Sequence, residues 1–308
     1  MNKPKFWDEK INYIAIVLSP LSFIFSFLVF VKKKITKATS FKIPIICIGN
    51  IYIGGTGKTP VSIFLANELA SLGKKPVIIR KFYKNHRDEY NLIRNSFKNL
   101  LIGKNRIEGI RKAETSNYNI ALLDDGLQDY KIKKDLNIVC FNNYQLIGNG
   151  LVLPSGPLRE NLSALKNFHI VIINGKKNKQ FEEKILKIND KLDIFYSYYM
   201  PQNLDQFKNK KLLAIAGIGN PENFFQLIEN NKLNIEKKLI YPDHYVFSES
   251  EIKNIIKDAE INNYQIIMTE KDYFKINHFN INKINYLKVS LELEKKEMLL
   301  NRVRSIYE

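Results

Sequence analysis

Apolar residues occur along the chain in short continuous runs, separated by segments in which apolar positions lie three or four residues apart. The runs rich in β-branched residues lie at 43–48, 75–79, 119–123, 136–141 and 169–174. Such runs are typical of strands buried on both faces, and the helical spacing between them indicates βαβ units. The pattern predicts an α/β fold with a mostly parallel sheet, helices on both faces, and ligand sites at the carboxyl ends of the strands.

The pattern restarts after a polar, lysine-rich segment at 203–211. Beyond it we expect strands at 212–216 and 265–268 and a helix at 249–259, which is enough for a second, smaller α/β domain. The predicted regions are an N-terminal helical segment (1–36), a core domain (37–205) and a smaller C-terminal α/β domain (206–308).

The segment 14–31 carries no charge and ends at three consecutive lysines, Lys32, Lys33 and Lys34. Its length is at the lower limit for a membrane-spanning helix, and Pro20 interrupts it. Lysines at this position would meet anionic headgroups on the cytoplasmic side. We expect a membrane-associated helix that spans the bilayer or lies in its interface. The alternative is a helical hairpin buried in the core and bent at Pro20.

A glycine-rich turn follows the first strand and precedes a helical pattern at 61–72. Glycines lack Cβ, so consecutive N–H groups can turn toward one anion, and the following helix adds the positive end of its dipole. Lys58 can reach the outer phosphates of a nucleotide, and the Thr59 hydroxyl can bind Mg²⁺. The usual pattern has glycine where this chain has Tyr52, and a plain glycine-rich turn is the alternative. The predicted nucleotide-binding residues are Gly54, Gly55, Thr56, Gly57, Lys58 and Thr59.

Two acidic residues, Asp124 and Asp125, end the strand at 119–123. They match a Walker B position, where carboxylate oxygens hold Mg²⁺ directly or through water. An aspartate that caps the junction between strand and turn is the alternative. Further along, the loop 148–160 contains three glycines and two prolines. A long loop of restricted shape favours a ligand-facing role over a simple turn.

The net charge of +17 over 308 residues calls for an anionic partner or surface, although a biased base composition of the genome would also explain scattered lysines. Aromatic residues are not interleaved with the basic ones, so we expect no nucleic-acid binding. Cys47 and Cys140 both lie in apolar runs, which indicates neither a disulfide framework nor a metal site and fits a reducing compartment.

Six segments resemble, in the same order, the motifs of one family. They are GGTGKTP at 54–60, DDGLQ at 124–128, LPSGPLRE at 153–160, AGIGNP at 216–221, PDH at 242–244 and TEKD at 269–272. Together they resemble those of tetraacyldisaccharide 4'-kinase, the lipid A 4'-kinase, over nearly the whole chain. The first segment is shared with many nucleoside triphosphatases, whereas the third is far more specific to this family.

The resemblance implies a kinase that uses ATP and Mg²⁺. Its acceptor would be the 4'-hydroxyl of an acylated glucosamine disaccharide 1-phosphate, at the cytoplasmic face of the inner membrane. An anionic membrane surface is the expected partner, with no nucleic acid and no obligate protein partner. Two alternatives stay open: a membrane-associated P-loop nucleotide switch, and a soluble P-loop kinase for a small metabolite.

The resemblance also implies roles for particular residues. Asp88 would be the general base, His244 its partner, and Lys58 a stabiliser of the transferred phosphoryl group, because a carboxylate held by an imidazole can take the proton of a sugar hydroxyl. The implied metal-binding residues are Thr59, Asp124, Asp125 and Glu160. The candidates for contact with substrate or phosphate are Glu89, Arg106, Asn149 and Arg159, of which Arg106 could equally be a solvated helix cap.

Three positions depart from the family pattern. The segment 80–83 reads Arg-Lys-Phe-Tyr where the family has Arg-Gly-Tyr, and Arg87 precedes Asp88 in place of glycine. Asp129 stands where we expect histidine. These departures concern the side chains at the mouth of the nucleotide site.

Overall fold

The structure, a computed structural model, describes residues 4–9, 12–84, 86–243, 245–279 and 281–308. The chain forms two compact units. The large unit consists of Lys3–Phe82, Phe97–Tyr198 and Leu293–Glu308, and the small unit contains Tyr83–Ser96 and Tyr199–Glu292.

This division differs from the predicted regions 1–36, 37–205 and 206–308. Residues 83–96 leave the expected core domain because α4 (Arg87–Ser96) packs against α9 (Glu270–Ile276) of the small unit. The end of the chain belongs to the large unit, where α10 (Lys296–Arg304) buries Leu299, Leu300 and Val303. Residues from 3 to 36 are also grouped with the large unit.

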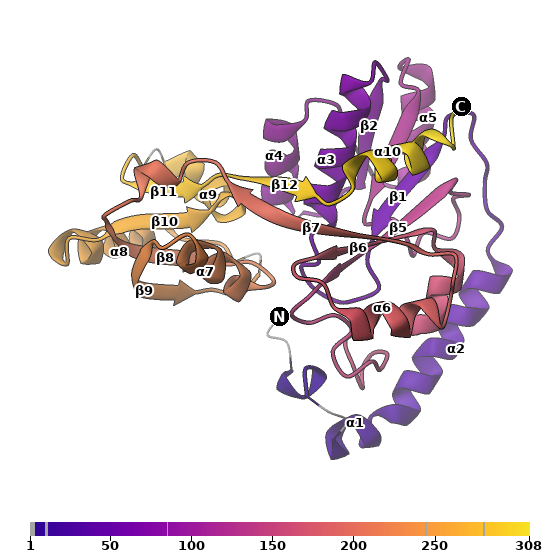
Figure 1. Ribbon diagram of the computed structural model, residues 1–308, viewed down its shortest axis with the longest axis horizontal. Coiled ribbons are helices and arrows are strands. Elements are labelled where there is room, and N and C mark those ends of the chain that lie inside the picture. Colours follow the sequence, from indigo (N-terminus) through magenta and orange to yellow (C-terminus); the bar gives the residue numbers. More distant parts are fainter. Residues whose placement is uncertain (1–3, 10–11, 85, 244, 280) are drawn as a thin grey trace. The chain divides into compact units, whose positions relative to one another are not determined.

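The large unit contains most of a sheet of eight strands in the order β12-β7-β6-β5-β1-β4-β2-β3 (Figure 1), whereas most of β12 and the end of β7 fall within the residue ranges of the small unit. The strands are β1 (Ile45–Gly49), β2 (Pro76–Lys81), β3 (Leu100–Gly103), β4 (Ile120–Asp124), β5 (Leu136–Asn142), β6 (Ile170–Asn174), β7 (Asp193–Pro201) and β12 (Val289–Leu293). Central β1 pairs in parallel with β4 on one side and β5 on the other. The expectation of a mostly parallel α/β sheet is confirmed.

Helices cover both faces of this sheet. One core combines alternate strand residues such as Cys47, Ile79 and Leu123 with α5 (Arg106–Thr115) and α6 (Lys179–Leu186). The intervening strand residues, including Ile46 and Ile78, are also fully buried. Since successive residues of a strand point to opposite faces, the latter residues face the other layer, and α3 (Lys58–Ser71) packs on β1, β2 and β4.

The small unit contains a four-stranded parallel sheet in the order β11-β10-β8-β9. Its strands are β8 (Lys211–Ala216), β9 (Asn234–Ile240), β10 (Gln265–Thr269) and β11 (Ile284–Leu287), and its further helices are α7 (Pro221–Asn230) and α8 (Glu249–Ile261). Leu212 and Ala214 pack with Phe225 of α7, whereas Leu213 and Ile215 pack with α8. The two faces therefore have separate cores, as period-two alternation requires.

The N-terminal segment forms α1 (Tyr13–Val17) and α2 (Ser19–Ile35), with Pro20 in the first turn of α2, where its missing N–H leaves no bond unmade. In α2, whose residues are all described, only Ser22 is buried. Phe23 is 75% exposed and Phe27 56% exposed. The alternative of a hairpin buried in the core is therefore wrong. Among the described residues, none of the helices has both the length and the hydropathy of a membrane span.

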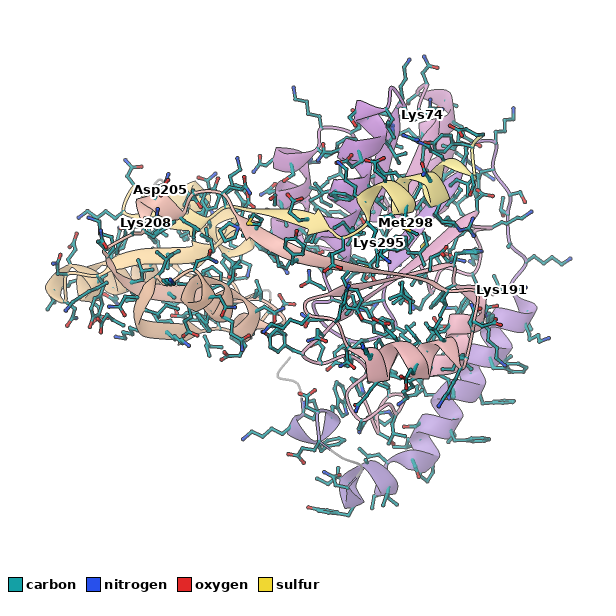
Figure 2. The ribbon with its side chains drawn as sticks, viewed as in Figure 1. Lys74, Lys191, Asp205, Lys208, Lys295 and Met298 are labelled. Atoms are coloured by element: carbon teal, nitrogen blue, oxygen red, sulfur yellow. The ribbon has the colours of Figure 1, made fainter. Side chains whose placement is uncertain are left out.

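The part of the chain that the structure describes also contains four short 3-10 helices: η1 (Lys5–Trp7), η2 (Leu162–Asn167), η3 (Leu204–Gln206) and η4 (Asn277–Phe279). The lysine excess is spread over the surface. In the large unit Lys191 is exposed and Lys74 is half-buried, and in the small unit Lys208 pairs with Asp205, both of them exposed (Figure 2).

Candidate active site

The glycine-rich turn between β1 and α3 has the backbone conformation that its sequence predicts. Gly54 has a φ of 126°, and Gly57, the N-cap of α3, has a φ of 85°, both disfavoured for residues with a Cβ. The fully buried Asn50 donates from its side-chain amide to the Gly54 carbonyl (3.1 Å) and to the Thr56 hydroxyl (3.0 Å). Asn50 thus closes the turn from inside, a role that sequence reasoning missed.

Beside this turn lies a buried charge pair. The parallel register of β1 and β4 sets Ile48 against Asp124. Asp124 accepts a hydrogen bond from the Thr59 hydroxyl (3.0 Å), and its Oδ2 lies 3.0 Å from Nη1 of Arg80. Arg80 is 3% exposed and Asp124 is fully buried. Sequence reasoning named Arg80 only as the first residue of a segment that departs from the family pattern. An arginine at the end of an apolar strand nevertheless indicates that the strand has a buried acidic partner nearby.

Asp125 faces two cations of the large unit. Its Oδ1 lies 3.1 Å from Arg159 Nη1 and 3.9 Å from Lys58 Nζ. Burial by itself would raise the pKa of Asp125, but the cations of Lys58 and Arg159 outweigh burial and hold its pKa below the ordinary value. Asp125 therefore stays ionised next to the turn, and Lys58 points toward the end of β4.

Arg106 is buried and anchors the turn after β4. Its Nη2 donates to the carbonyls of Asp124 (3.3 Å) and Asp125 (2.6 Å), and its Nη1 lies 3.6 Å from the Asp129 carboxylate. The cap of α5 is Asn105, whose side chain accepts from the backbone N–H of Glu108, so the alternative of a solvated helix cap for Arg106 is wrong. Asp129, which departs from the family pattern, gains an ion-pair partner here.

The loop 148–160 contributes Glu160 to the same region. Glu160 accepts a hydrogen bond from the Gln128 side chain (2.9 Å), and that side chain also donates to the Asn50 carbonyl (3.1 Å). Asn149, by contrast, holds the loop itself, because it donates to the Ser155 carbonyl and accepts from the N–H of Leu151.

The same loop carries the N-terminal helices. Ser22 of α2 donates to the Val152 carbonyl (2.9 Å) and lies 2.7 Å from the Ser155 hydroxyl. The indole of Trp7 donates to the Pro154 carbonyl (3.0 Å). The loop 148–160 therefore contacts α2 through Val152 and Ser155 and contacts Gln128 through Glu160.

The donor set in this region fits Mg²⁺. No group of three or more histidine, cysteine or acidic side chains among the described residues has the arrangement of a metal site. Mg²⁺ requires only one or two carboxylates, because waters and substrate phosphates supply its other oxygens. The Thr59 hydroxyl and the Asp124 carboxylate, 3.0 Å apart, are hard oxygen ligands of this kind.

Two further predicted residues, Asp88 and Glu89, lie in the small unit. Asp88 and Glu89 are in the first turn of α4, and Asp88 is 5% exposed. Lys271, the second residue of α9, lies 3.6 Å from Asp88, 3.4 Å from Glu89 and 3.0 Å from Asp243. His244, the predicted partner of Asp88, lies outside the described residues. Sequence reasoning missed Lys271 as a member of this group, although the TEKD segment was already conspicuous.

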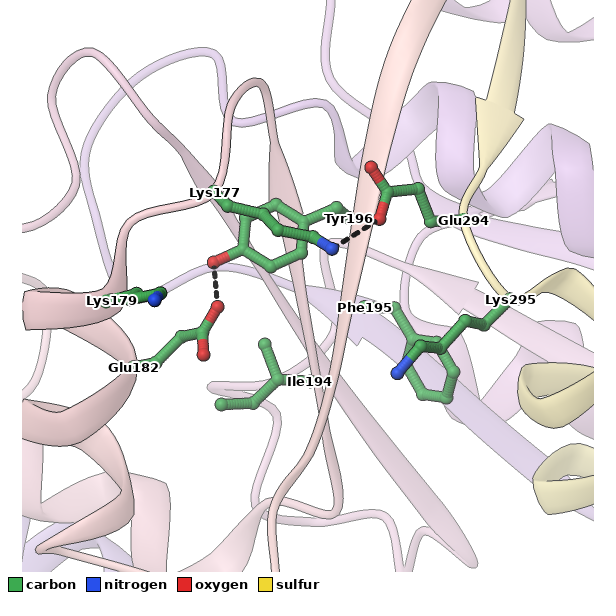
Figure 3. A pocket seen from close by; sticks show the side chains of 8 residues that line it. All are labelled: Lys177, Lys179, Glu182, Ile194, Phe195, Tyr196, Glu294 and Lys295. Atoms are coloured by element: carbon green, nitrogen blue, oxygen red, sulfur yellow. Dashed lines mark hydrogen bonds and ion pairs between the residues drawn. The ribbon is translucent and has the colours of Figure 1, made fainter.

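A pocket of about 300 Å³ in the large unit holds none of these residues. Lys177 pairs with Glu294 (3.2 Å), and the Tyr196 hydroxyl donates to Glu182 (Figure 3). Most of the polar side chains that line this pocket therefore already have partners. The pocket is lined by Lys177, Lys179, Glu182, Ile194, Phe195, Tyr196, Glu294 and Lys295.

Comparison with known proteins identifies the family. The sequence model of tetraacyldisaccharide-1-P 4'-kinase matches residues 14–307. The chain belongs to this family. A tetraacyldisaccharide 4'-kinase of Pelagibacter ubique is 42% identical, covering 100% of this chain and 99% of the relative. A family member from Francisella tularensis subsp. novicida is 33% identical, covering 94% of this chain and 98% of the relative.

The fold is also that of a solved structure in the family. The crystal structure of LpxK from Aquifex aeolicus, described as in complex with ATP, superposes with a TM-score of 0.72. The two sequences are 20% identical, and the match covers 96% of this chain and 100% of the other. The α/β architecture that the sequence predicts is therefore the architecture of the family.

Proposed function

We propose that this chain transfers the γ-phosphoryl group of ATP to the 4'-hydroxyl of an acylated glucosamine disaccharide 1-phosphate. The observation that carries the proposal is the arrangement at the ends of β1 and β4. There a glycine turn leads into α3, Lys58 points toward Asp125, and the Thr59 hydroxyl bonds to Asp124. This arrangement, in a chain of a 4'-kinase family, provides the groups that bind a nucleoside triphosphate.

The large unit supplies the nucleotide site. Backbone N–H groups of residues 54–57 and the N-terminus of α3 would bind the phosphates, and Lys58 would contact the outer ones. Thr59 and Asp124 would hold Mg²⁺, with Asp125 and Glu160 as further carboxylates of the site. When bound, this ion supplies positive charge that stabilises the transferred phosphoryl group. Arg159 is the candidate for a further phosphate contact, because its guanidinium already meets Asp125.

The small unit supplies the base. The Asp88 carboxylate would take the proton of the 4'-hydroxyl while that oxygen bonds to the γ-phosphorus and the bond to the β-phosphate oxygen breaks, releasing ADP. His244 is the proposed partner that orients this carboxylate. Most of the rate would come from positioning and electrostatic stabilisation, as is general for phosphoryl transfer.

We infer that the acceptor is reached from the cytoplasmic face of the inner membrane, through α1 and α2. Most apolar side chains of α2, including Phe23 and Phe27, face solvent, whereas its Ser22 is docked on the loop 148–160. This is the reverse of an ordinary surface helix. An exposed apolar face that ends in Lys32, Lys33 and Lys34 suits an interface with anionic headgroups.

A transfer assay with γ-labelled ATP tests the proposal. The acceptors are an acylated disaccharide 1-phosphate, free sugars, and no acceptor. We expect label in the lipid alone, and a loss of about 100-fold or more in kcat for Asp88→Asn and for Lys58→Ala. Lys253→Ala, which changes an exposed lysine of α8, serves as the matched control.

Three results would contradict the proposal. Near-normal transfer by Asp88→Asn or Lys58→Ala would remove the role of that residue. Hydrolysis of ATP that only a macromolecule stimulates would indicate a nucleotide switch. Label in a soluble metabolite would indicate a different kinase.

A further inference from the structure

We propose that Lys271 is a positioning residue for phosphoryl transfer, whose ammonium group keeps the Asp88 carboxylate ionised and in place. The inference rests on the proposed role of Asp88 as the general base. Lys271 is not one of the predicted nucleotide-binding residues, and Lys271, Asp88, Glu89 and Asp243 all lie in the small unit.

Three carboxylates from two different segments surround one ammonium group. Lys271 Nζ lies 3.0 Å from Asp243 Oδ1, 3.4 Å from Glu89 Oε1 and 3.6 Å from Asp88 Oδ2. Asp88 and Glu89 come from α4, and Asp243 follows β9. The ammonium group therefore links the segment that contains the proposed base to Asp243, the residue that precedes His244 in the sequence.

Burial makes this charge balance important. The Asp88 side chain is 5% exposed, and those of Glu89 and Lys271 are 15% and 17% exposed. Carboxylates held this close together in a poorly solvated place take up protons unless a cation compensates their charge. A protonated Asp88 could not accept the proton of a sugar hydroxyl, so the reaction depends on the compensating charge.

The lysine itself remains charged in this setting. Burial lowers the pKa of Lys271, but the neighbouring carboxylates, with Glu89 the strongest, outweigh burial and hold its pKa above the ordinary value. Among the described residues, His86 also faces the cluster, since its Nδ1 lies 3.2 Å from Glu89 Oε2. Lys271 is thus a permanent positive charge over the pH range in which the carboxylates titrate.

The position of Lys271 is set by its own helix. Thr269 caps α9 by accepting a hydrogen bond from the N–H of Asp272 (3.1 Å). The fully buried Asp272 in turn accepts from the N–H of Gly217 (2.7 Å) and pairs with Lys275 (2.6 Å). The first turn of α9 is therefore fastened to the loop after β8, so that a fixed backbone presents Lys271 to the carboxylates.

The test compares kcat and KM for ATP and for the acylated disaccharide between about pH 5.5 and 9.5. The acid limb of the wild-type kcat profile should report the ionisation of the base. In Lys271→Met the midpoint of this limb should lie about 1–3 pH units higher than in the wild type. Below the midpoint kcat should fall about tenfold for each further pH unit, and at alkaline pH kcat should recover. KM for ATP should change by less than about twofold, because neither Lys271 nor the carboxylates that it contacts are among the predicted nucleotide-binding residues.

Conservative and matched variants separate charge from structure. Lys271→Arg should keep the wild-type limb, because it keeps the positive charge. Glu89→Gln, which leaves the ammonium group intact and removes one negative charge, should move the limb to lower pH. Lys253→Met, which removes an exposed cation of α8 that pairs with Glu249, should leave the limb where it is.

The proposal is overturned if Lys271→Met lowers kcat by the same factor at every pH, which would indicate a purely structural role, or if it leaves the profile unchanged. Should Lys271→Met fail to fold, an unshifted limb in Glu89→Gln overturns it independently. A wild-type protein that transfers no label to the lipid would refute the proposed function as well. An active wild type whose variants show no shift would refute the role of Lys271 alone.

Discussion

The buried pair of Arg80 and Asp124 allows a quantitative test of how the nucleotide site is held together. Replacing Arg80 with Met removes the guanidinium that lies 3.0 Å from Asp124 Oδ2 and leaves an apolar chain of similar length. The aspartate is fully buried at the end of a central strand, so water cannot take the place of the lost cation. The Thr59 hydroxyl, which donates to the same carboxylate oxygen, is neutral and does not replace the lost positive charge.

The expected loss is that of a broken buried ion pair, about 3–5 kcal/mol in the free energy of unfolding of the large unit. With an m value of roughly 3 kcal/mol/M, the urea midpoint should fall by about 1–2 M. The double variant Arg80→Met/Asp124→Asn removes both charges and should regain most of this loss, because the buried carboxylate is then gone. Neither variant should transfer phosphate normally, since Asp124 is a proposed metal ligand.

Unfolding in urea, without nucleotide or metal, is followed by the fluorescence of Trp7. This is the single tryptophan of the chain, and it is 4% exposed in the large unit. Circular dichroism provides a second probe. A loss below about 1 kcal/mol, as for a solvent-exposed pair, would refute the reasoning. So would a double variant that is no more stable than Arg80→Met.

Three further predictions concern the large unit. Phe27→Glu on the exposed face of α2 should weaken sedimentation with phosphatidylglycerol vesicles by about tenfold or more, with unchanged stability; equal binding would contradict the membrane role. Gly148→Ala should cost about 1–3 kcal/mol and alter Trp7 fluorescence, because φ is +57° and a Cβ would lie 2.4 Å from the Trp7 carbonyl oxygen. Burial, together with Arg302, lowers the pKa of His169, which accepts from the Asn137 N–H. The contribution of His169 to the free energy of unfolding should therefore be complete above about pH 6.5 and decline below it. His169→Gln should remove this pH dependence of the free energy of unfolding, measured by urea titrations between about pH 5 and 7.5.

The features that the sequence predicts correctly depend on residues close together in the chain. The glycine turn could be recognised because a left-handed backbone at Gly57 is a local requirement. The central strands could be recognised because strands buried on both faces need continuous apolar residues. Asp124 could be assigned to the end of a strand for the same reason. The roles proposed for Asp88 and His244 came from the resemblance to the family.

The tertiary structure decided which distant residues meet. Arg80 and Asp124 are brought together by the neighbouring strands β2 and β4, and Asn50 closes the phosphate turn through bonds that its residue type does not specify. The grouping of residues 83–96 with the small unit follows from the packing of α4 on α9, which brings Asp88 and Glu89 to Lys271, and the loop after β9 adds Asp243. Sequence periodicity records which face of an element is apolar, but charge pairing depends on the register and packing of separate elements, which only the folded chain determines.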